Sequence, residues 1–327
     1  MDPEQRKFDD IATEVESFVS VHQQGCLMQS PRWALVKPRW GRHLLLSRDA
    51  KGNLRGSMLV LTLADRGDGS SLLYAPRGPV CDPHDHKTIC ELIFSVRELS
   101  GRFCHGEFKC DPLIEENDLK AVRALVDAGL EYTPQTTFGQ TSQPRQNAVR
   151  SDLAGLDEKT LFARLSYKTR YAIRRASEAG LRCTAEEGDS AFADFLQLYL
   201  ETGRRQKFAT RPADYLRGLL AAFGRDARLY LCRDALGRPL AGAIAVAFGP
   251  RLSYLYSGSV RTADDPGGGY LLQWELLRWA LQAGCVFYDM GGICTDPQES
   301  FALFQLYQFK RKFAPAVNYA GEFHFRF

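Results

Sequence analysis

The most informative candidate for catalysis is a lysine near the C-terminus. Lys310 follows Phe309 in a stretch of helical character that ends with Arg311, Lys312 and Phe313. An ammonium group fixed beside a reacting carbonyl would stabilise the oxyanion of an acyl-transfer intermediate by an amount on the order of 3 kcal/mol. The same residues also fit a solvated basic helix end, where cations offset the negative end of the helix dipole. The residues alone leave both interpretations open.

A second candidate is Asp111, which stands where a short strand is predicted to end and could act as a general base. Pro112 follows it, and Asp-Pro is equally common in an ordinary turn. No Gly-x-Ser-x-Gly motif and no readable Cys/His pairing supply a nucleophile. The sequence therefore offers no motif for a covalent acyl-enzyme.

A third candidate is the basic segment 164–182, which has six cations against one acidic residue and contains Tyr167 and Tyr171. On one continuous helix, Arg164, Lys168, Tyr171 and Arg175 would share a face suited to the phosphates of RNA. A basic helix face is as often simply solvated. The cations are Arg164, Lys168, Arg170, Arg174, Arg175 and Arg182.

Other stretches that resemble ligand sites have plainer interpretations. Residues 267–269 are glycines before a predicted helix, but they lack the Lys and Ser/Thr of a P-loop. No clean Arg-x-x-Gly-x-Gly/Ala loop for the pyrophosphate of CoA is present, so we interpret the glycines as a connector. The nine cysteines include no Cys-x-x-Cys pair and are interpreted as reduced thiols. The stretch 83–86, with two histidines, is interpreted as a loop that starts a helix. We expect no metal and no cofactor.

Length and composition set the frame for these residues. The 327 residues are enough for two domains with separate cores, and 45% hydrophobic with 25% charged residues is typical of a folded, soluble chain. A net charge of +3 neither requires nor excludes a polyanionic partner. The apolar runs are too short to span a bilayer and the N-terminus is polar, so we expect a cytoplasmic protein.

An internal repeat organises the chain. Residues 44–52 read LLLSRDAKG and residues 229–237 read LYLCRDALG, and both predict a strand that enters a polar turn. Two further strands follow each copy. The order then continues in both halves as helix, short strand and helix. Two copies of one α/β module explain this order better than a coincidence of turn residues.

The repeat suggests the domain boundaries. We expect a first module over 1–149 and a second over 150–316, with the polar stretch 141–150 as the crossing. Residues 317–327 alternate like a final strand. The pattern alone leaves open which module that strand joins, and pairing with the first is one possibility.

Several stretches resemble the FemABX family of peptidoglycan bridge-forming aminoacyltransferases, whose modules have the fold of GCN5-related acetyltransferases. Each match is weak alone, but their order and spacing over nearly the whole chain are fairly specific. The matching stretches are MQSPRWALVK at 28–37 followed by Trp40, APRGPV at 75–80, CDP at 110–112, RPADY at 211–215, LLQWE at 271–275, YDMGGI at 288–293 and YQFKRKF at 307–313.

The resemblance implies a fold and a reaction. The fold would be α/β (α+β), with two tandem acetyltransferase-like modules, each a mixed twisted sheet flanked by helices. The enzyme would transfer an amino acid from aminoacyl-tRNA to the side-chain amine of the stem peptide in a peptidoglycan precursor. The sequence lacks the heptads of the inserted arm found in longer relatives, so it resembles the short branch that acts on soluble UDP-MurNAc-pentapeptide. Lipid II stays possible as acceptor. We expect a monomer with at most peripheral membrane contact.

The resemblance also implies roles for individual residues. It favours catalysis by Lys310 with Phe309. Lys37 and Arg211 match positions that contact the nucleotide diphosphate in relatives, and their wide separation in sequence predicts a site between the modules. Tyr215, one helical turn beyond Arg211, and Tyr256 are candidates to line the muramyl-peptide site. Lys168, Arg174 and Arg175 are the candidates for contact with tRNA.

Two other functions fit parts of the sequence. One is a CoA-dependent N-acyltransferase of the same fold, against which the missing pyrophosphate loop speaks. The other is a non-catalytic RNA-binding protein built on decayed modules, against which the retained Phe309-Lys310 and Lys37/Arg211 residues speak. The sequence does not identify the amino acid transferred, the tRNA, or a lysine rather than ornithine acceptor.

Overall fold

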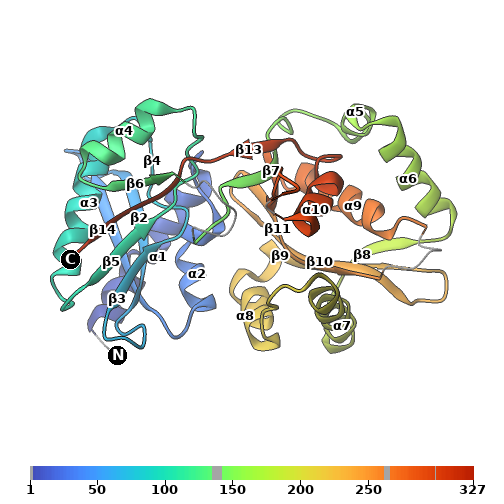
Figure 1. Cartoon of the computed structure of the whole chain (residues 1–327), viewed down its shortest axis with the longest axis horizontal. Coiled ribbons are helices and arrows are strands. Elements are labelled where there is room, and N and C mark those ends of the chain that lie inside the picture. Colours follow the sequence, from blue (N-terminus) through green and yellow to red (C-terminus); the bar gives the residue numbers. More distant parts are fainter. Residues whose placement is uncertain (1–2, 135–141, 261–265, 299) are drawn as a thin grey trace. The chain divides into compact units, whose positions relative to one another are not determined.

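The chain folds into two compact units in this computed structural model, which describes residues 3–134, 142–260, 266–298 and 300–327. Unit 1 comprises Met1–Asn147 together with Val317–Phe327, and unit 2 comprises Ala148–Ala316 (Figure 1). The passage from unit 1 to unit 2 falls within the predicted crossing 141–150. Thr141 itself lies outside the described residues.

Unit 1 is a mixed sheet with strand order β1-β2-β3-β5-β14-β6, and β4 pairs with β2. Its helix α3 begins as predicted for the stretch 83–86, because the Asp85 side chain accepts the backbone N–H of Thr88 at 3.1 Å. The elements are α1 (Pro3–Val21), η1 (Leu27–Gln29), α2 (Pro31–Val36), β1 (Gly41–Arg48), β2 (Leu54–Leu63), β3 (Ser71–Ala75), β4 (Val80–Cys81), α3 (His86–Ser100), β5 (Gly106–Cys110), α4 (Leu119–Asp127), β6 (Glu131–Pro134) and β14 (Gly321–Arg326).

Unit 2 is built around a sheet with strand order β13-β7-β12-β11-β10-β9-β8. Helices α7 and α8 lie on one face of this sheet and α9 and α10 on the other (Figure 1). The elements are β7 (Gln146–Arg150), α5 (Glu158–Arg164), α6 (Tyr167–Glu178), β8 (Arg182–Glu186), α7 (Asp189–Gln206), α8 (Ala213–Phe223), η2 (Gly224–Asp226), β9 (Ala227–Arg233), β10 (Pro239–Phe248), β11 (Arg251–Ser259), α9 (Gly268–Gln282), β12 (Phe287–Gly292), α10 (Phe301–Lys310) and β13 (Ala316–Asn318).

The internal repeat of the sequence forms the same turn in both units. Asp49 and Asp234 each use one carboxylate oxygen to accept the backbone N–H groups two and four residues further on, at 2.8–3.0 Å. Gly52 and Gly237 complete the turns with φ of +88° and +79°, a region that favours glycine. The hairpins β1–β2 and β9–β10 therefore have the same local chemistry.

The order of elements after each hairpin is also repeated. In unit 1, β3 is followed by the two-residue strand β4, by α3, by β5 parallel to β3, and by α4. In unit 2, β11 is followed by α9, by β12 parallel to β11, and by α10. The prediction of an α/β fold with two tandem modules, each a mixed sheet flanked by helices, is confirmed. Among the described residues, no helix combines the length and the apolar character needed to cross a membrane.

The C-terminal segment differs from the single strand expected over 317–327. It forms two strands in two sheets: β13 ends at Asn318 beside β7, and β14 begins at Gly321 between β5 and β6. Gly321 has φ of +120°, which other residues rarely adopt. The alternating pattern hid this change of direction, because strands in either sheet bury alternate side chains.

The basic segment is not one continuous helix. Helix α5 ends at Arg164, and Ser166 starts α6 by accepting the backbone N–H of Thr169 at 3.2 Å. A serine at this position stabilises the start of a new helix better than the continuation of an old one. Arg164 and Arg182 therefore lie outside α6, and the predicted helical face that included Arg164 is wrong.

Unit 2 contains one close contact between backbones that requires glycine. A Cβ added at Gly258 on β11 would lie 2.3–2.4 Å from backbone atoms of Leu198 and Tyr199 in α7. Neither neighbour is a flexible side-chain end, so the helix would have to move away from the sheet. Gly218, in the interior of α8, has no atom within 4 Å of the same position.

We therefore predict opposite effects of two glycine substitutions. Gly258→Ala should lower the free energy of unfolding by about 2–3 kcal/mol, because it overpacks the α7–β11 contact. Gly218→Ala should raise it by up to about 1 kcal/mol, because alanine is the better helix former. Urea unfolding followed by circular dichroism measures both. A Gly258→Ala variant as stable as wild type would contradict the packing described for α7.

Candidate active site

Strands β11 and β12 pair over only part of their length. The parallel register joins Arg251 to Phe287 and ends with Ser253 beside Asp289, although β11 continues to Ser259 and β12 to Gly292. Backbone groups beyond this point need other partners, because buried N–H and C=O groups are almost always hydrogen-bonded. In unit 1 the corresponding strands, β3 and β5, pair along all of β3. Unit 2 therefore has a stretch without strand-to-strand pairing between β11 and β12, called the opening below, whereas β3 of unit 1 is paired throughout.

Lys310 occupies the end of this opening. It is the last residue of α10, is only 6% exposed, and donates from Nζ to the carbonyl oxygen of Gly292 at 2.9 Å. Burial lowers the pKa of Lys310 to about 8, an effect that the nearby Asp289 carboxylate partly opposes. The side chain is thus a buried, oriented donor whose charge changes close to neutral pH.

The carboxylate that faces Lys310 is itself held in place. Asp289 accepts the backbone N–H of Gly291 at 2.8 Å and lies 3.3 Å from the guanidinium of Arg251, which is 5% exposed. These contacts fix the turn at the end of β12. They therefore also fix the Gly292 carbonyl that receives the lysine.

An aromatic wall adjoins Lys310. The Phe309 ring packs edge-on against Tyr270 with centroids 5.4 Å apart, and Phe313 completes the group at 5.5 Å from Phe309. Lys312 bonds through Nζ to the hydroxyl of Tyr270 and lies 4.9 Å from the centre of its ring. The end of α10 and the start of α9 thus place Lys312 beside the rings of Tyr270 and Phe309, two residues along the chain from Lys310.

The predicted residues Arg211, Tyr215 and Tyr256 lie together in unit 2. The Tyr256 hydroxyl donates to the Tyr215 hydroxyl at 3.3 Å, and the Arg211 guanidinium lies 5.4 Å from the centre of the Tyr215 ring. Tyr199 accepts the backbone N–H of Arg211 at 3.0 Å. Burial raises the pKa of Tyr215, so its hydroxyl stays protonated at neutral pH. Arg211 is exposed, so this cluster offers an accessible cation held by tyrosines.

Tyr256 and the carbonyl bound by Lys310 belong to the two strands beside the opening, but Tyr256 packs against Tyr199 of α7 and Tyr215 of α8, whereas Lys310 ends α10 on the other face of the sheet. Tyr256 on β11 and Gly292 on β12 each stand three residues beyond the last pair, Ser253 and Asp289. The side of the opening formed by β11 thus carries a tyrosine, and the side formed by β12 carries the carbonyl bound by Lys310.

Lys37 belongs to unit 1, at the end of α2. Ser30 starts this helix by accepting the backbone N–H of Arg32 at 3.1 Å, as the sequence predicts. The Lys37 backbone closes the helix on Ala34, and its Nζ lies 5.6 Å from the ring centre of Trp33. Its half-buried stem therefore leaves the ammonium at the surface of unit 1.

Asp111, the candidate general base, is enclosed within unit 1. It is 2% exposed; Tyr74 donates its hydroxyl to one carboxylate oxygen and Arg77 its backbone N–H to the other, both at 2.7 Å. Burial raises the pKa of Asp111 to about 6, while the charge of Arg77 acts in the opposite direction. With both oxygens occupied, Asp111 holds the turn after β3 to the end of β5, and its contacts favour this structural role.

The three predicted tRNA contacts all lie on α6. Lys168, Arg174 and Arg175 are exposed on this helix, and Arg174 also lies 5.3 Å from the centre of the Phe162 ring. Arg170, in contrast, donates to the carbonyls of Ala163 and Leu165 at the end of α5 and is used there. Helix α6 therefore presents a shorter basic surface than the sequence suggested.

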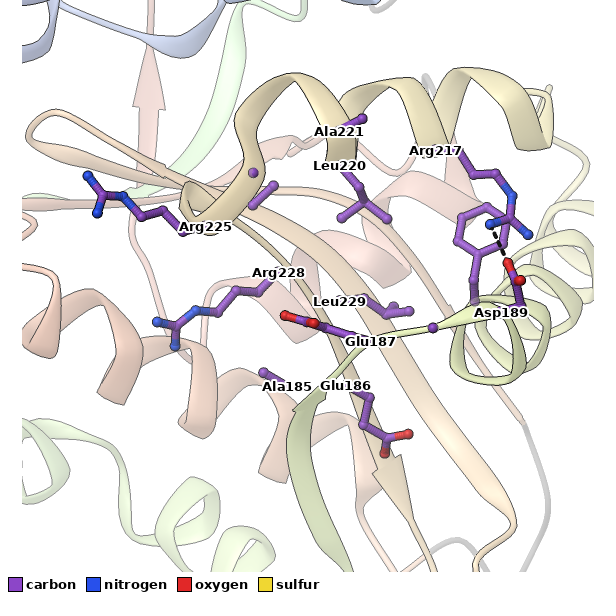
Figure 2. A pocket seen from close by; sticks show the side chains of 14 residues that line it. Ala185, Glu186, Glu187, Asp189, Arg217, Leu220, Ala221, Arg225, Arg228 and Leu229 are labelled. Carbon is purple, nitrogen blue, oxygen red and sulfur yellow. Dashed lines mark hydrogen bonds and ion pairs between the residues drawn. The ribbon is translucent and has the colours of Figure 1, made fainter.

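A separate pocket of about 850 Å³ lies on the α7–α8 side of unit 2 (Figure 2). At one end Arg217 points to Asp189 and pairs with it at 2.8 Å, while Arg225 and Arg228 point the other way. Arg228 lies 4.6 Å from the ring centre of Trp279. None of the residues predicted for the site lines this pocket. The opening beside Lys310, not this pocket, is therefore the candidate active site.

Comparison with known proteins places this geometry in a family. Residues 11–236 match the FemAB family, and residues 163–311 match an acetyltransferase (GNAT) domain. The chain belongs to the FemAB family. The predicted FemABX resemblance is thereby confirmed.

Individual relatives match this FemAB-family chain along nearly its full length. It is 28% identical over 321 residues to UDP-N-acetylmuramoylpentapeptide-lysine N(6)-alanyltransferase from Weissella viridescens, covering 94% of this chain and 91% of the relative. It is 22% identical over 381 residues to lipid II:glycine glycyltransferase from Staphylococcus epidermidis, covering 95% and 90%. The crystal structure of FemX superposes with a TM-score of 0.87 at 20% identity, covering 96% of this chain and 95% of FemX, which shows the shared fold.

Sequence reasoning missed part of the site in this FemAB-family chain. Asp289 stands inside the matched stretch 288–293, so a signal existed, but its contact with Arg251 joins different strands. Tyr270 carried no motif signal of its own, and Lys312, although inside the matched stretch 307–313, was assigned no role. Their contact joins the start of one helix to the end of another.

The lowered pKa of Lys310 predicts a specific dependence of stability on pH. Between pH 8 and about 10.5 the unfolded chain binds a proton at Lys310 that the folded chain does not, so stability should rise with pH in this window. The gain should reach roughly 2–3 kcal/mol relative to Lys310→Met, which lacks the titrating group. Urea unfolding of both proteins at pH 7, 8, 9 and 10 measures it.

The exposed Lys159 provides the matched control for this experiment. Lys159→Met should show the same pH dependence as wild type. Parallel curves for wild type and Lys310→Met would contradict the buried position of Lys310.

Proposed function

We propose that this chain is an aminoacyltransferase of peptidoglycan synthesis. It transfers an amino acid from aminoacyl-tRNA to the side-chain amine of a lysine or ornithine in the stem peptide of a cell-wall precursor. The acceptor is UDP-MurNAc-pentapeptide or lipid II. Family membership supports the proposal, as do two relatives named as an alanyltransferase and a glycyltransferase that act on these two precursors.

The observation that carries the proposal is the placement of Lys310. It lies buried at the end of the opening between β11 and β12, where backbone groups are no longer used by the sheet. A substrate carbonyl in that opening would receive a hydrogen bond from a charged donor in a low-dielectric surrounding, where such a bond is strongest. At neutral pH most Lys310 side chains carry the proton, since their pKa is about 8.

The reaction needs little beyond this donor. The neutral acceptor amine attacks the ester carbonyl of the aminoacyl group, and the oxyanion of the tetrahedral intermediate forms beside the Lys310 ammonium. Collapse forms the amide bond, breaks the ester bond, and releases the ribose hydroxyl, which takes up a proton while the amine nitrogen loses one. Phe309 precedes Lys310 in α10 and packs against Tyr270.

Direct detection of the product tests this proposal. The protein is incubated with UDP-MurNAc-pentapeptide and a pool of charged tRNA, and the precursor is analysed by mass spectrometry. A mass increase of one amino acid residue is expected, and it should disappear when the tRNA is uncharged. No mass increase with either UDP-MurNAc-pentapeptide or lipid II would refute the proposed function.

A second candidate is a CoA-dependent N-acyltransferase, which the match of residues 163–311 to an acetyltransferase domain favours. Thermal unfolding with acetyl-CoA separates the two candidates. A clear rise of the melting temperature with acetyl-CoA, but none with UDP-MurNAc-pentapeptide, would support the second candidate.

The proposal predicts a selective loss of rate when the ammonium is removed. Lys310→Met should lower turnover by roughly two orders of magnitude while leaving affinity for the precursor nearly unchanged, because the charge acts on the intermediate. Steady-state kinetics and calorimetry measure the two quantities, and Lys159→Met should behave like wild type. Weaker precursor binding with unchanged turnover would make Lys310 a binding residue instead.

The proposal also assigns the precursor diphosphate to Lys37 and Arg211, one cation from each unit. Losing either cation should weaken binding of UDP-MurNAc-pentapeptide by about 1.5–3 kcal/mol, the range for a charged hydrogen bond. The double variant should lose less than the sum if both cations hold the same group. Calorimetric titration of Lys37→Met, Arg211→Met and the double variant measures this coupling.

This mutant cycle has two controls. UMP lacks the diphosphate, so its affinity should barely differ among the variants. Arg204→Met, which removes another exposed cation of unit 2, is the control variant. Full additivity, or equal losses with UMP, would show that Lys37 and Arg211 serve separate sites. In that case Tyr215 and Tyr256, which share the Arg211 cluster, would have to be reassigned with it.

A further inference from the structure

Helix α6 carries two aromatic rings where a soluble protein ordinarily has polar groups. Tyr167 is 71% exposed and Tyr171 57% exposed, and their rings are nearly parallel, at 20°, with centroids 6.4 Å apart. The two residues are four positions apart and so lie on one side of the helix. The opposite side of α6 holds Thr169, Ile173 and Ala176, which are buried. The tyrosines are therefore not part of the core.

The surroundings of the pair are cationic. Arg174 lies seven positions beyond Tyr167, and Arg175 four beyond Tyr171, so both arginines share the outer side of the helix with the rings. The outer side contains no aliphatic side chain, which argues against insertion into a membrane, where Leu, Phe or Trp would be expected. Stacked rings with neighbouring cations match the needs of unpaired nucleotides instead, because every base has a face that stacks and every linkage an anionic phosphate.

Helix α6 is also joined to the candidate active site. A Cβ at Gly267, just before α9, would lie 3.3 Å from the Ala172 carbonyl and 3.7 Å from Ala176, so α6 packs on the start of α9. Tyr270 follows Gly267 by three residues in α9, and its ring contacts Phe309 and Lys312, which flank Lys310 in the sequence. One continuous part of unit 2 therefore links the tyrosine pair to the catalytic lysine.

We propose that Tyr167 and Tyr171 form a stacking platform for the unpaired 3′ end of aminoacyl-tRNA. This inference rests on the proposed function and deepens it by naming which part of the RNA the helix binds. The ester to be cleaved is on the last nucleotide of a single-stranded end. Stacking of the preceding bases on the tyrosines would restrict that end, while Arg174 and Arg175 neutralise its phosphates. A duplex offers no exposed base faces along its length, so the platform selects the single-stranded part.

The test uses the full chain and two RNA hairpins derived from an acceptor stem. One ends in an unpaired 3′ ACCA with 2-aminopurine in place of the first adenine of that end, and the other is blunt. Binding is measured by fluorescence anisotropy over a range of salt concentrations, and stacking by quenching of the 2-aminopurine. The single variants are Tyr167→Ala, Tyr171→Ala, Tyr167→Phe and Tyr171→Phe. The double variant combines Arg174→Gln with Arg175→Gln. Leu236→Ala, which removes another highly exposed apolar side chain of unit 2, is the matched control.

Each class of variant has its own expected result. Each Tyr→Ala change should weaken binding of the ACCA hairpin about tenfold, with less quenching and an unchanged salt dependence, because stacking releases no counterions. The Tyr→Phe variants should stay within about twofold of wild type. The arginine variant should show a shallower salt dependence. The blunt hairpin should bind wild type and Tyr→Ala variants equally.

Several results would overturn the platform. One is unchanged affinity of the Tyr→Ala variants for the ACCA hairpin, and another is an equal loss for the blunt hairpin. Tyrosine-dependent binding to phosphatidylglycerol vesicles without any effect on RNA would make the surface a membrane contact. Amino acid transfer by the wild type distinguishes a failure of the platform from a failure of the proposed function. If transfer is normal and the tyrosine variants bind RNA like wild type, only the platform is wrong. If the wild type neither transfers nor binds RNA, the proposed function fails with it.

Discussion

Strands β11 and β12 pair in parallel for three residues and then stop, and the candidate active site depends on this interruption. Up to Ser253 and Asp289 the two strands satisfy each other's backbone groups, and beyond that point they do not. A buried carbonyl without a partner is unfavourable, and Lys310 provides the missing donor for Gly292. The same geometry therefore explains why a lysine is buried, why its pKa is lowered, and why it points to the place where a substrate carbonyl could bind.

The two modules show how one topology can either close or open at this position. In unit 1, β3 pairs with β5 over its whole length, and Asp111 seals the strand ends by bonding Tyr74 and Arg77. In unit 2, Asp289 occupies a comparable place at the end of the parallel pair, but it faces Arg251 and the lysine. The repeated turns at Asp49 and Asp234 are alike. The two modules therefore have the same hairpin turns and differ at the ends of their parallel strands, where the candidate active site lies.

The cations of unit 2 act differently in its interior and at its surface. Inside, one lysine is stripped of water and held by a carbonyl, so its charge acts over a short range with little screening. Outside, the cations of α6 are exposed to salt, which weakens each contact and allows a bound polyanion to leave. This division suits the proposed reaction, in which a large RNA would be released after each transfer.

The sequence by itself determined the order of elements, the duplication and the family, because these depend on local patterns: alternation in strands, Asp and Gly in the turns, and short motifs in a fixed order. It also pointed to Phe309 and Lys310 through their family match. It could not place the break at Ser166 or the two strands within 317–327. A single serine cap or glycine turn is a weak signal beside the helical or alternating pattern of the residues around it. The tertiary structure alone decided which polar groups became partners. Asp111 directly follows β5 and Asp289 lies within β12, yet one is enclosed by Tyr74 and Arg77 and the charge of the other acts on Lys310. That difference arises from contacts between residues far apart in the chain, which no local pattern contains.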